Sequence, residues 1–272
     1  MPTVYFIGAG PGDAELITVK GARLLGEADV VVYAGSLVDY ELVRIHAPRA
    51  EVHDSAGLTL AETTRLLADA VTAGKRAVRL HTGDPSLYGA IQEQMQELDR
   101  VGIFYEVVPG VTSAFAAAAA LKQELTLPEV SQTVIVTRLA GRTPAPERER
   151  LAKIAKIGAT LVVYLSVGMI EKVVAELLQG AYTLATPVAV AARVSWPDQQ
   201  IIEGTLADIA GKIRAAGIDR QAVIIVGDVL KARQQELAAV SKLYDKAFSH
   251  GYRDGITEEP APRPQPPAPD QP

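Results

Sequence analysis

The 272-residue sequence contains no cysteine, and aromatic side chains make up only 5% of it. The lack of cysteine excludes disulfide bonds, thiolate catalysis and cysteine-based metal sites, and it predicts a reducing, cytoplasmic environment. No uninterrupted apolar run is long enough to cross a bilayer, so we expect no membrane association. The N-terminus leads directly into the apolar segment Val4–Ile7 without a basic region or cleavage site, which argues against secretion.

Basic residues do not dominate the chain either, because its formal net charge is -5. This balance argues against a general nucleic-acid binder, so any acidic ligand must be met by local cations. His46 and His53 are separated by Pro48 and share no helix face, so we expect no metal site.

Apolar strand-like runs alternate with helical stretches along the chain, which predicts an α/β protein with mainly parallel sheets. We expect two αβα domains, at residues 1–122 and 123–232. The predicted strands are Val4–Ile7, Val30–Tyr33, Ala77–Leu80, Tyr105–Val108, Thr133–Thr137, Leu161–Leu165, Val188–Ala191, Gln200–Glu203 and Val223–Val226. The main predicted helices are Asp13–Ala28, Tyr40–His46, Thr59–Ala73, Leu87–Leu98 and Ala114–Leu121.

Three segments lie outside this alternation. The polar stretch Arg138–Glu149 contains Pro144 and Pro146, and we interpret it as a mobile lid over a cleft. Residues 233–255 are expected to form a C-terminal helix. Residues 256–272 contain seven of the chain's 17 prolines and few apolar residues, so we expect a disordered tail.

Three loops rich in glycine and proline follow strands of the first domain: Gly8–Asp13, Thr82–Pro85 and Pro109–Ser113. The carboxyl ends of parallel strands meet at one sheet edge, so the loops predict a ligand site there. Glycines 8, 10 and 12 would let a ligand approach the backbone, and Asp13 would repel a pyrophosphate, which favours a neutral ligand or a sulfonium. Asp84 is either a hydrogen-bond acceptor for such a ligand or a helix cap.

These motifs, in this order, resemble the tetrapyrrole methylase family, and the likeness runs from about Thr3 to Leu230. It is carried by Gly8–Asp13, Leu16–Gly21, Gly83–Pro85, Pro109–Ser113 and Thr160–Leu165. Within the family, Tyr33–Val38 and Arg193–Asp198 resemble the branch that methylates C-11 of precorrin-4 in vitamin B12 synthesis. The alternatives are a cobalt-loaded substrate, methylation of uroporphyrinogen III or another position, and a non-catalytic nucleotide-binding module.

The resemblance implies that S-adenosylmethionine binds in a cleft between the two domains and donates a methyl group, without a metal. It also implies a homodimer. The implied cofactor contacts are Pro11, Thr82, Gly83, Asp84, Leu87, Thr112, Ser113, Leu165 and Val194.

The implied tetrapyrrole substrate carries many carboxylates, which arginine can bind with its forked guanidinium. For the substrate we predict contacts from Tyr33, Gly35, Ser36, Arg44 and Arg138, and Arg49, Arg65 and Arg142 are further candidates. Each single arginine is better explained as a solvated surface residue, and it is the group of arginines around one cleft that favours a substrate role. The small residues Ala34 and Gly35 are interpreted as leaving room for the macrocycle. The general base stays unassigned among Tyr33, Asp39, His46 and His53.

Overall fold

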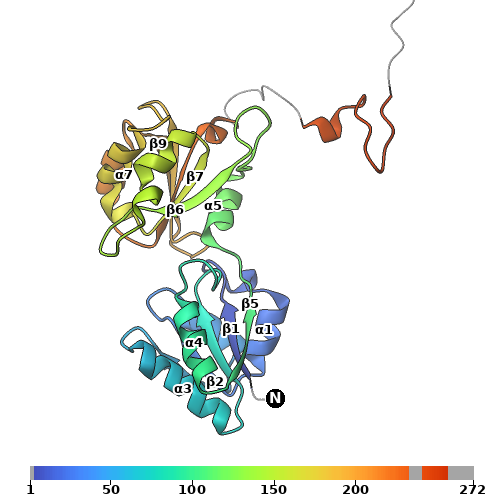
Figure 1. Ribbon diagram of the computed structural model, residues 1–272, viewed down its shortest axis with the longest axis vertical. Coiled ribbons are helices and arrows are strands. Elements are labelled where there is room, and N and C mark those ends of the chain that lie inside the picture. The colour runs from blue at the N-terminus through green and yellow to red at the C-terminus, as the bar shows by residue number, and fades with distance from the viewer. Residues whose placement is uncertain (1–2, 233–240, 257–272) are drawn as a thin grey trace, which may run out of the picture.

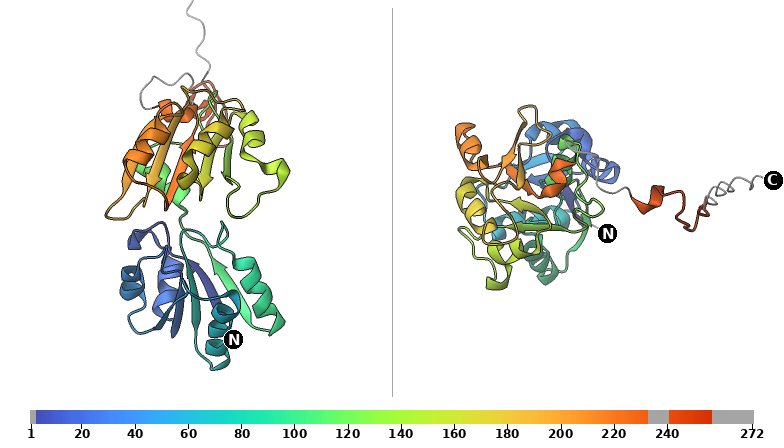
Figure 2. Two further views of the ribbon diagram at one scale, coloured as in Figure 1. Left: turned by 90° about the vertical axis from the view of Figure 1, so that its left-hand side faces the viewer. Right: turned by 90° about the horizontal axis from the view of Figure 1, so that it is seen from above.

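The computed structural model describes residues 3–232 and 241–256. Two α/β domains lie end to end along the long axis of the molecule, with α5 and the chain that precedes it running between them (Figure 1). The views in Figure 2 show that strand-end loops of both domains face the junction.

The first domain is a parallel sheet with helices on both faces. Its strand order is β3-β2-β4-β1-β5, and every pairing is parallel. One apolar core joins the sheet to α1 and α2, and a second joins it to α3 and α4. The strands are β1 (Thr3–Gly8), β2 (Val30–Tyr33), β3 (Glu51–Asp54), β4 (Ala77–His81) and β5 (Phe104–Val108), and the helices are α1 (Val19–Gly26), α2 (Tyr40–His46), α3 (Leu60–Thr72) and α4 (Ile91–Arg100).

The sheet of the second domain is mixed. Its order is β6-β7-β10-β8-β9, in which only β6 and β7 pair in parallel and the other three pairings are antiparallel. The α/β class is confirmed, but the expectation of mainly parallel pairing holds for the first domain alone. The strands are β6 (Val134–Arg138), β7 (Thr160–Tyr164), β8 (Pro187–Ala192), β9 (Gln200–Thr205) and β10 (Ala222–Val226).

The helix α5 (Ser113–Leu121) packs on the second sheet, although we expected it to close the first domain. Its residues Ala114, Ala117 and Leu121 share a buried cluster with Val162 and Ile225. Its small side chains let the helix lie close to the strands. The packing therefore changes from one domain to the other before α5, not at residue 122. The opposite face of the sheet packs against α6 (Leu151–Ile154), α7 (Ile170–Leu177) and α8 (Ile209–Ala215).

Two predicted helices differ from the observed ones. The stretch Asp13–Ala28 is divided into a short 3-10 helix and α1, because the Thr18 side chain accepts a hydrogen bond from the Gly21 amide and starts a new helix there. α4 begins at Ile91 instead of Leu87, because Tyr88 and Ala90 have left-handed backbone conformations (φ 57° and 49°). The predictions also omitted the polar edge strand β3.

The C-terminal predictions lie partly outside the described residues, which exclude 233–240 and 257–272. Within 241–256 the expected helix is reduced to a 3-10 turn at Lys242–Tyr244, and an isolated bridge joins His250 to Arg253. Gly251 and Gly255 interrupt this segment, which disfavours a continuous helix. The tail prediction for 256–272 concerns residues almost entirely outside the description. In the described ranges no helix has the length and apolarity that a membrane crossing requires.

Candidate functional site

A cavity of about 600 Å³ lies where the two domains meet. The first domain lines it with loops that follow β1, β2, β4 and β5, and the second domain lines it with residues beside β6, β7, β8 and β10. All nine residues predicted to contact the cofactor line this cavity: Pro11, Thr82, Gly83, Asp84, Leu87, Thr112, Ser113, Leu165 and Val194. The structure thus brings this set together, and its role in cofactor binding stays a prediction.

Close packing of glycines holds the first-domain loops together. A Cβ atom on Gly110 would lie 2.1 Å from the Gly83 carbonyl oxygen, and one on Gly8 would lie 2.6 Å from the Gly110 Cα atom. Gly10 and Gly83 also exchange backbone hydrogen bonds of 3.3 and 2.8 Å, with φ values of +81° and +58°. The loops therefore need glycine to contact one another.

This packing corrects our interpretation of the first loop. Glycines 8, 10 and 12 face protein atoms, and only Pro11 from this loop lines the cavity. A Cβ atom on Gly12 would lie 2.2 Å from the Trp196 ring. Asp13 does not line the cavity, and its carboxylate caps the 3-10 helix by accepting a hydrogen bond from the Glu15 amide at 2.9 Å. The charge of Asp13 therefore does not select the ligand of this cavity.

Asp84 is half-buried and joins two of the loops. Its Oδ2 atom accepts a hydrogen bond from the Gly110 amide at 2.9 Å, and Oδ1 accepts one from the Ser86 amide at 2.8 Å. α4 begins at Ile91 with no side-chain cap, so Asp84 does not cap that helix. Its carboxylate fixes the loop that follows β4, and Asp84 is one of the residues that line the cavity.

Two tyrosines that were not predicted as site residues also line the cavity. The Tyr164 hydroxyl accepts a hydrogen bond from the Ala114 amide at 2.8 Å and lies 2.6 Å from Thr112 Oγ1. The Tyr88 ring lies 5.7 Å from the Tyr164 ring, and burial raises the pKa of Tyr88. Tyr164 lies within the motif Thr160–Leu165, but its side chain resembles any aromatic residue of a core strand, so the sequence did not mark it as a cavity residue.

Of the five residues predicted to contact the substrate, the structure places only one in the cavity lining. Arg138 lines the cavity, but Tyr33, Gly35, Ser36 and Arg44 are outside its lining, although Leu37 from the same loop belongs to it. Arg44 is exposed on α2 and forms an ion pair with Glu41.

The space beside Gly35 is also not free. A Cβ atom there would lie 2.3 Å from an Asp54 carboxylate oxygen, and the Gly35 amide donates to Asp54 Oδ1 at 3.0 Å. The small residue therefore fits against Asp54, which corrects the idea that it makes room for a macrocycle.

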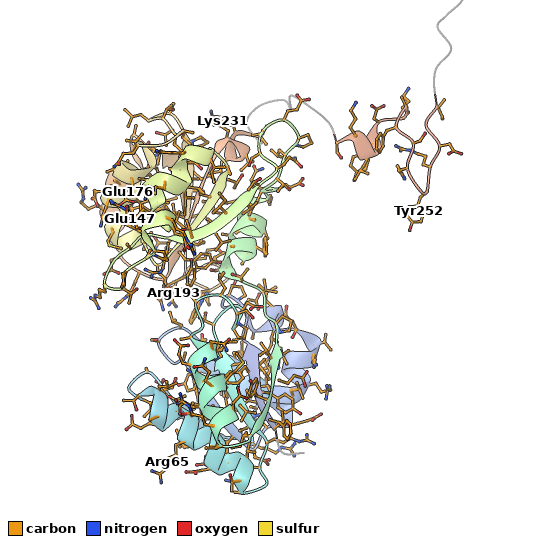
Figure 3. The ribbon with its side chains drawn as sticks, in the orientation of Figure 1. Arg65, Glu147, Glu176, Arg193, Lys231 and Tyr252 are labelled. Atoms are coloured by element: carbon orange, nitrogen blue, oxygen red, sulfur yellow. The ribbon has the colours of Figure 1, made fainter. Side chains whose placement is uncertain are left out.

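The arginines of the predicted lid have different environments. Arg138 donates to the backbone carbonyls of Thr143 and Pro144 at 3.2 and 2.6 Å, so it shapes its own loop. Arg142 lines the cavity from the same loop. Arg65 projects from α3 far from the domain junction, whereas Arg193 lies at it (Figure 3). Whether the loop moves as a lid stays a prediction.

A buried histidine is the most perturbed titratable side chain near the loops. His81 ends β4, is 4% exposed, and its Nε2 atom has no hydrogen-bond partner. Burial, and secondarily the Arg79 charge, lower the pKa of His81 to about 3. His81 is absent from the cavity lining, so it is no candidate for the base. Within residues 3–232 and 241–256 no group of three or more His, Asp or Glu side chains is placed to hold a metal.

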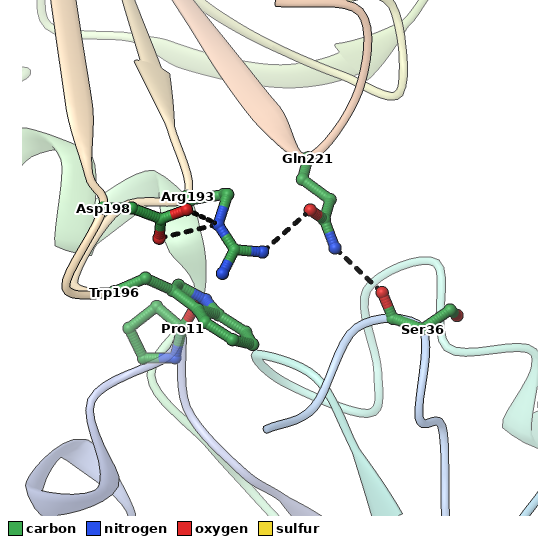
Figure 4. Close-up of polar contacts among 6 residues, drawn as sticks. All are labelled: Pro11, Ser36, Arg193, Trp196, Asp198 and Gln221. Carbon is green, nitrogen blue, oxygen red and sulfur yellow. Dashed lines mark hydrogen bonds and ion pairs between the residues drawn. The ribbon is translucent and has the colours of Figure 1, made fainter. Parts of the chain in front are cut away.

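Polar contacts across the junction connect the domains beside the cavity (Figure 4). The Trp196 indole donates to the Pro11 carbonyl at 2.9 Å, and the Gln221 amide donates to the Ser36 carbonyl at 2.8 Å. The Asp13 amide also donates to Ser195 Oγ at 3.0 Å. Both first-domain acceptors are backbone carbonyls, so no sequence motif could reveal these pairs.

Comparison with known proteins matches residues 3–210 to the family of tetrapyrrole (corrin/porphyrin) methylases. A cobalt-precorrin-4 C(11)-methyltransferase from Methanocaldococcus jannaschii is 54% identical over 250 residues, covering 92% of this chain and 95% of that protein. A precorrin-4 C(11)-methyltransferase from Mycobacterium tuberculosis is 54% identical over 231 residues, covering 85% and 92%.

Solved structures of methyltransferases are also similar to this chain. The X-ray structure of a cobalamin biosynthetic enzyme, cobalt precorrin-4 methyltransferase, superposes with a TM-score of 0.82 at 49% identity, covering 84% of this chain and 95% of that one. A uroporphyrin-III C-methyltransferase from Thermus thermophilus, complexed with S-adenosylhomocysteine, gives 0.71 at 32% identity, covering 84% and 99%. The chain belongs to the tetrapyrrole methylase family.

Proposed function

We propose that this protein transfers a methyl group from S-adenosylmethionine to C-11 of precorrin-4, giving precorrin-5 in cobalamin biosynthesis. The observation that carries the proposal is that all nine predicted cofactor residues line one interdomain cavity. The relatives named for C(11) methylation, which are 54% identical to this chain, support the choice of substrate and carbon.

The cavity fits the methyl donor in size and chemistry. Its volume of about 600 Å³ is in the range typical of small-molecule sites. Its first-domain wall offers backbone groups of Gly83 and Thr82 beside the Asp84 carboxylate, and its second-domain wall offers the apolar Leu165 and Val194. These residues would hold S-adenosylmethionine, which supplies an electrophilic methyl group on a sulfonium when bound.

The contribution of the chain itself is alignment. Methyl transfer to an electron-rich pyrrole carbon needs no covalent protein intermediate, which agrees with a chain that has no cysteine. Holding two reactants in line and excluding water lowers a barrier by roughly 7–11 kcal/mol. The rigid glycine-packed loops on one side and the junction contacts on the other provide such alignment. The base that removes the later proton stays unassigned.

Carboxylate side chains of the macrocycle would be met by cations at the cavity. Arg142 and Arg220 line the cavity from the second domain, and Arg220 lies 3.7 Å from its neighbour Asp219 in a wholly exposed pair. Such an exposed pair contributes little by itself and exchanges easily for another carboxylate. We expect these two residues, rather than Arg44, to contact the substrate.

The presence of cobalt in the substrate is a separate question. Relatives named for the cobalt-containing and for the metal-free substrate have the same identity to this chain, 54%. Turnover with metal-free and cobalt-loaded precorrin-4, measured side by side, separates the two routes. A homodimer and a cytoplasmic location remain predictions, which size-exclusion chromatography with light scattering and fractionation would check.

The decisive experiment is product analysis. Purified protein, S-adenosylmethionine and precorrin-4 should yield a product heavier by one methyl group, placed at C-11 by NMR with a ¹³C-labelled donor. Methylation at another carbon would contradict the proposal. A thermal-shift comparison tests the cofactor alone, because a ligand at one hundred times its Kd stabilises a protein by about 2.7 kcal/mol. Stabilisation by NAD or ATP in place of S-adenosylmethionine would favour a nucleotide-binding module.

A further inference from the structure

A compact cluster around Arg193 organises the junction beside the cavity (Figure 4). Arg193 Nε donates to both carboxylate oxygens of Asp198 at 2.8 and 2.7 Å, and its guanidinium lies 4.1 Å from the centre of the Trp196 ring. Trp196 in turn donates to the Pro11 carbonyl. One guanidinium therefore supports the residue that contacts the first loop of the first domain.

The same guanidinium orients Gln221. Gln221 Oε1 accepts a hydrogen bond from Arg193 Nη1 at 3.1 Å, and Gln221 Nε2 donates to the Ser36 carbonyl at 2.8 Å. A guanidinium can only donate and a carbonyl can only accept, so the two ends of the amide cannot be exchanged. A carboxylate at this position would keep the hydrogen bond from Arg193 and lose the one to the Ser36 carbonyl.

The backbone of this cluster is strained at two residues. Gln221 and Arg193 adopt left-handed φ values of 52° and 46°, and the Arg193 amide donates to the Gln221 carbonyl at 2.8 Å. Non-glycine residues persist in this region where the surrounding structure imposes it, and they concentrate at functional sites. The position of the Gln221 side chain is thus fixed from both its backbone and its amide.

Ser36 connects this cluster to the wall of the cavity. It directly precedes Leu37, which lines the cavity, and the Leu37 amide donates to the Ala34 carbonyl at 2.9 Å. The loop is therefore a tight turn in which the place of Leu37 follows from that of Ser36. Gln221 holds the loop at its Ser36 carbonyl.

We propose that Gln221 is a positioning residue for the tetrapyrrole acceptor, acting through Ser36 on the first-domain wall of the cavity. This inference rests on the proposed function. None of the nine predicted cofactor contacts lies in the loop that carries Ser36, so the loss of the Ser36 contact displaces the acceptor relative to the donor without removing the donor site. A displacement of about 1 Å can lower a rate about 100-fold.

Three variants test the role. Gln221→Glu keeps an acceptor for Arg193 and loses the donor to Ser36, whereas Gln221→Ala loses both. Gln179→Ala is the matched control, because Gln179 is exposed just beyond the end of α7 and its side-chain amide donates to the Ala175 carbonyl of that helix, at 3.3 Å. Thermal melts establish that all three are folded.

The measurements separate the acceptor from the donor. Trp196 is the only tryptophan of the chain and lines the cavity, so quenching of its fluorescence reports precorrin-4 binding independently of turnover. We expect both Gln221 variants to lose at least 10-fold in kcat/KM and at least 5-fold in precorrin-4 affinity. Their Kd for S-adenosylhomocysteine, measured by calorimetry, should stay within 2-fold of wild type, as should every value for Gln179→Ala.

Two results would overturn the inference while leaving the proposed function intact. One is wild-type kcat/KM and precorrin-4 affinity in both Gln221 variants. The other is an equal loss of S-adenosylhomocysteine affinity, which would mean that Gln221 supports the whole cavity. If the wild-type protein neither methylates precorrin-4 nor shows quenching with it, the proposed function itself fails, and the inference falls with it.

Discussion

On the first-domain side of the cavity three loops pack glycine against glycine, whereas on the second-domain side the strand ends carry large side chains on left-handed backbone. Contacts among Gly8, Gly83 and Gly110 hold the loops of the first wall together. Leu165, Arg193 and Gln221, with φ values of 53°, 46° and 52°, line the second wall. One wall owes its shape to the absence of side chains. The other accepts backbone strain to place side chains at the cavity.

The difference predicts opposite responses to substitution. At Gly8 and Gly110, which hold the first wall together, an added methyl group has no space, so stability should fall. On the second wall replacement by glycine relieves backbone strain while removing a cavity side chain, so stability should be kept while function is lost.

The largest effect is expected for Gly110→Ala. The new Cβ atom would meet the Gly83 carbonyl oxygen at 2.1 Å and the Gly8 Cα atom at 2.8 Å, and neither is the end of a flexible side chain. Overpacking of this kind costs about 3 kcal/mol or more. The melting temperature should fall by roughly 6–12 °C, at about 2–4 °C per kcal/mol.

Gly211→Ala is the matched control, because nothing lies within 4 Å of a Cβ atom there and the residue is in the interior of α8. It should be neutral or stabilising by up to about 1 kcal/mol. A Gly110→Ala protein as stable as Gly211→Ala would contradict the account of the first wall.

The stability of the first domain should also depend on pH, through His81. Its pKa is about 3 in the folded protein, well below the unfolded value near 6.5, because the ring is buried and Nε2 has no partner. The unfolded state therefore binds the proton first as the pH falls. This contribution to stability is complete above about pH 6.5 and is lost progressively towards pH 3.

Between pH 7 and pH 5 the loss should be about 2 kcal/mol in the free energy of unfolding. Urea titrations at several pH values measure it, and His81→Leu should remove most of this pH dependence. A wild-type slope equal to that of His81→Leu over this interval would show that His81 is not kept neutral by the fold.

Asp84→Ala tests the link between the loops of the first wall. The substitution leaves the Gly110 amide without its acceptor at 2.9 Å, which costs about 1–2 kcal/mol for a half-buried group. S-adenosylhomocysteine affinity should fall at least 10-fold, because the loop that follows β4 loses its anchor beside the cavity. Asp84→Asn keeps one acceptor oxygen, so it should lie between wild type and alanine in both measurements. Unchanged affinity in Asp84→Ala would restrict this carboxylate to a structural role.

The first wall was largely predictable from the sequence, and the second was not. Glycine and proline at strand ends are visible locally, which is why Pro11, Thr82 and Thr112 could be placed at one sheet edge. Gln221 acts through a backbone carbonyl of a residue 185 positions away, and the carbonyl carries no sequence signal. Asp13 misled the charge argument because a carboxylate in a turn serves equally well as a cap.

The mixed sheet had a signal that was overlooked. Only a short turn separates β8 from β9, whereas a parallel pair requires a crossover of about a dozen residues. Antiparallel pairing of these strands therefore follows from the connection length. β3 was missed because Glu51 and Asp54 make it polar, as suits an edge strand.

The smallest effect on stability is expected for Leu165→Gly on the second wall. Leu165 is 67% exposed and has a φ of 53°, so its side chain contributes little core packing while its backbone is strained. Glycine relieves roughly 1 kcal/mol of strain and returns part of this as extra entropy of the unfolded chain. The net change should be a stabilisation of about 0.5 kcal/mol or less, with S-adenosylhomocysteine affinity reduced several-fold because the residue lines the cavity. Leu165→Ala is the control that removes the same contact and keeps the strain, so it should match the affinity loss and be slightly less stable. If glycine proves the less stable of the two, the left-handed conformation is not strained at Leu165, and the contrast between the walls does not hold at this position.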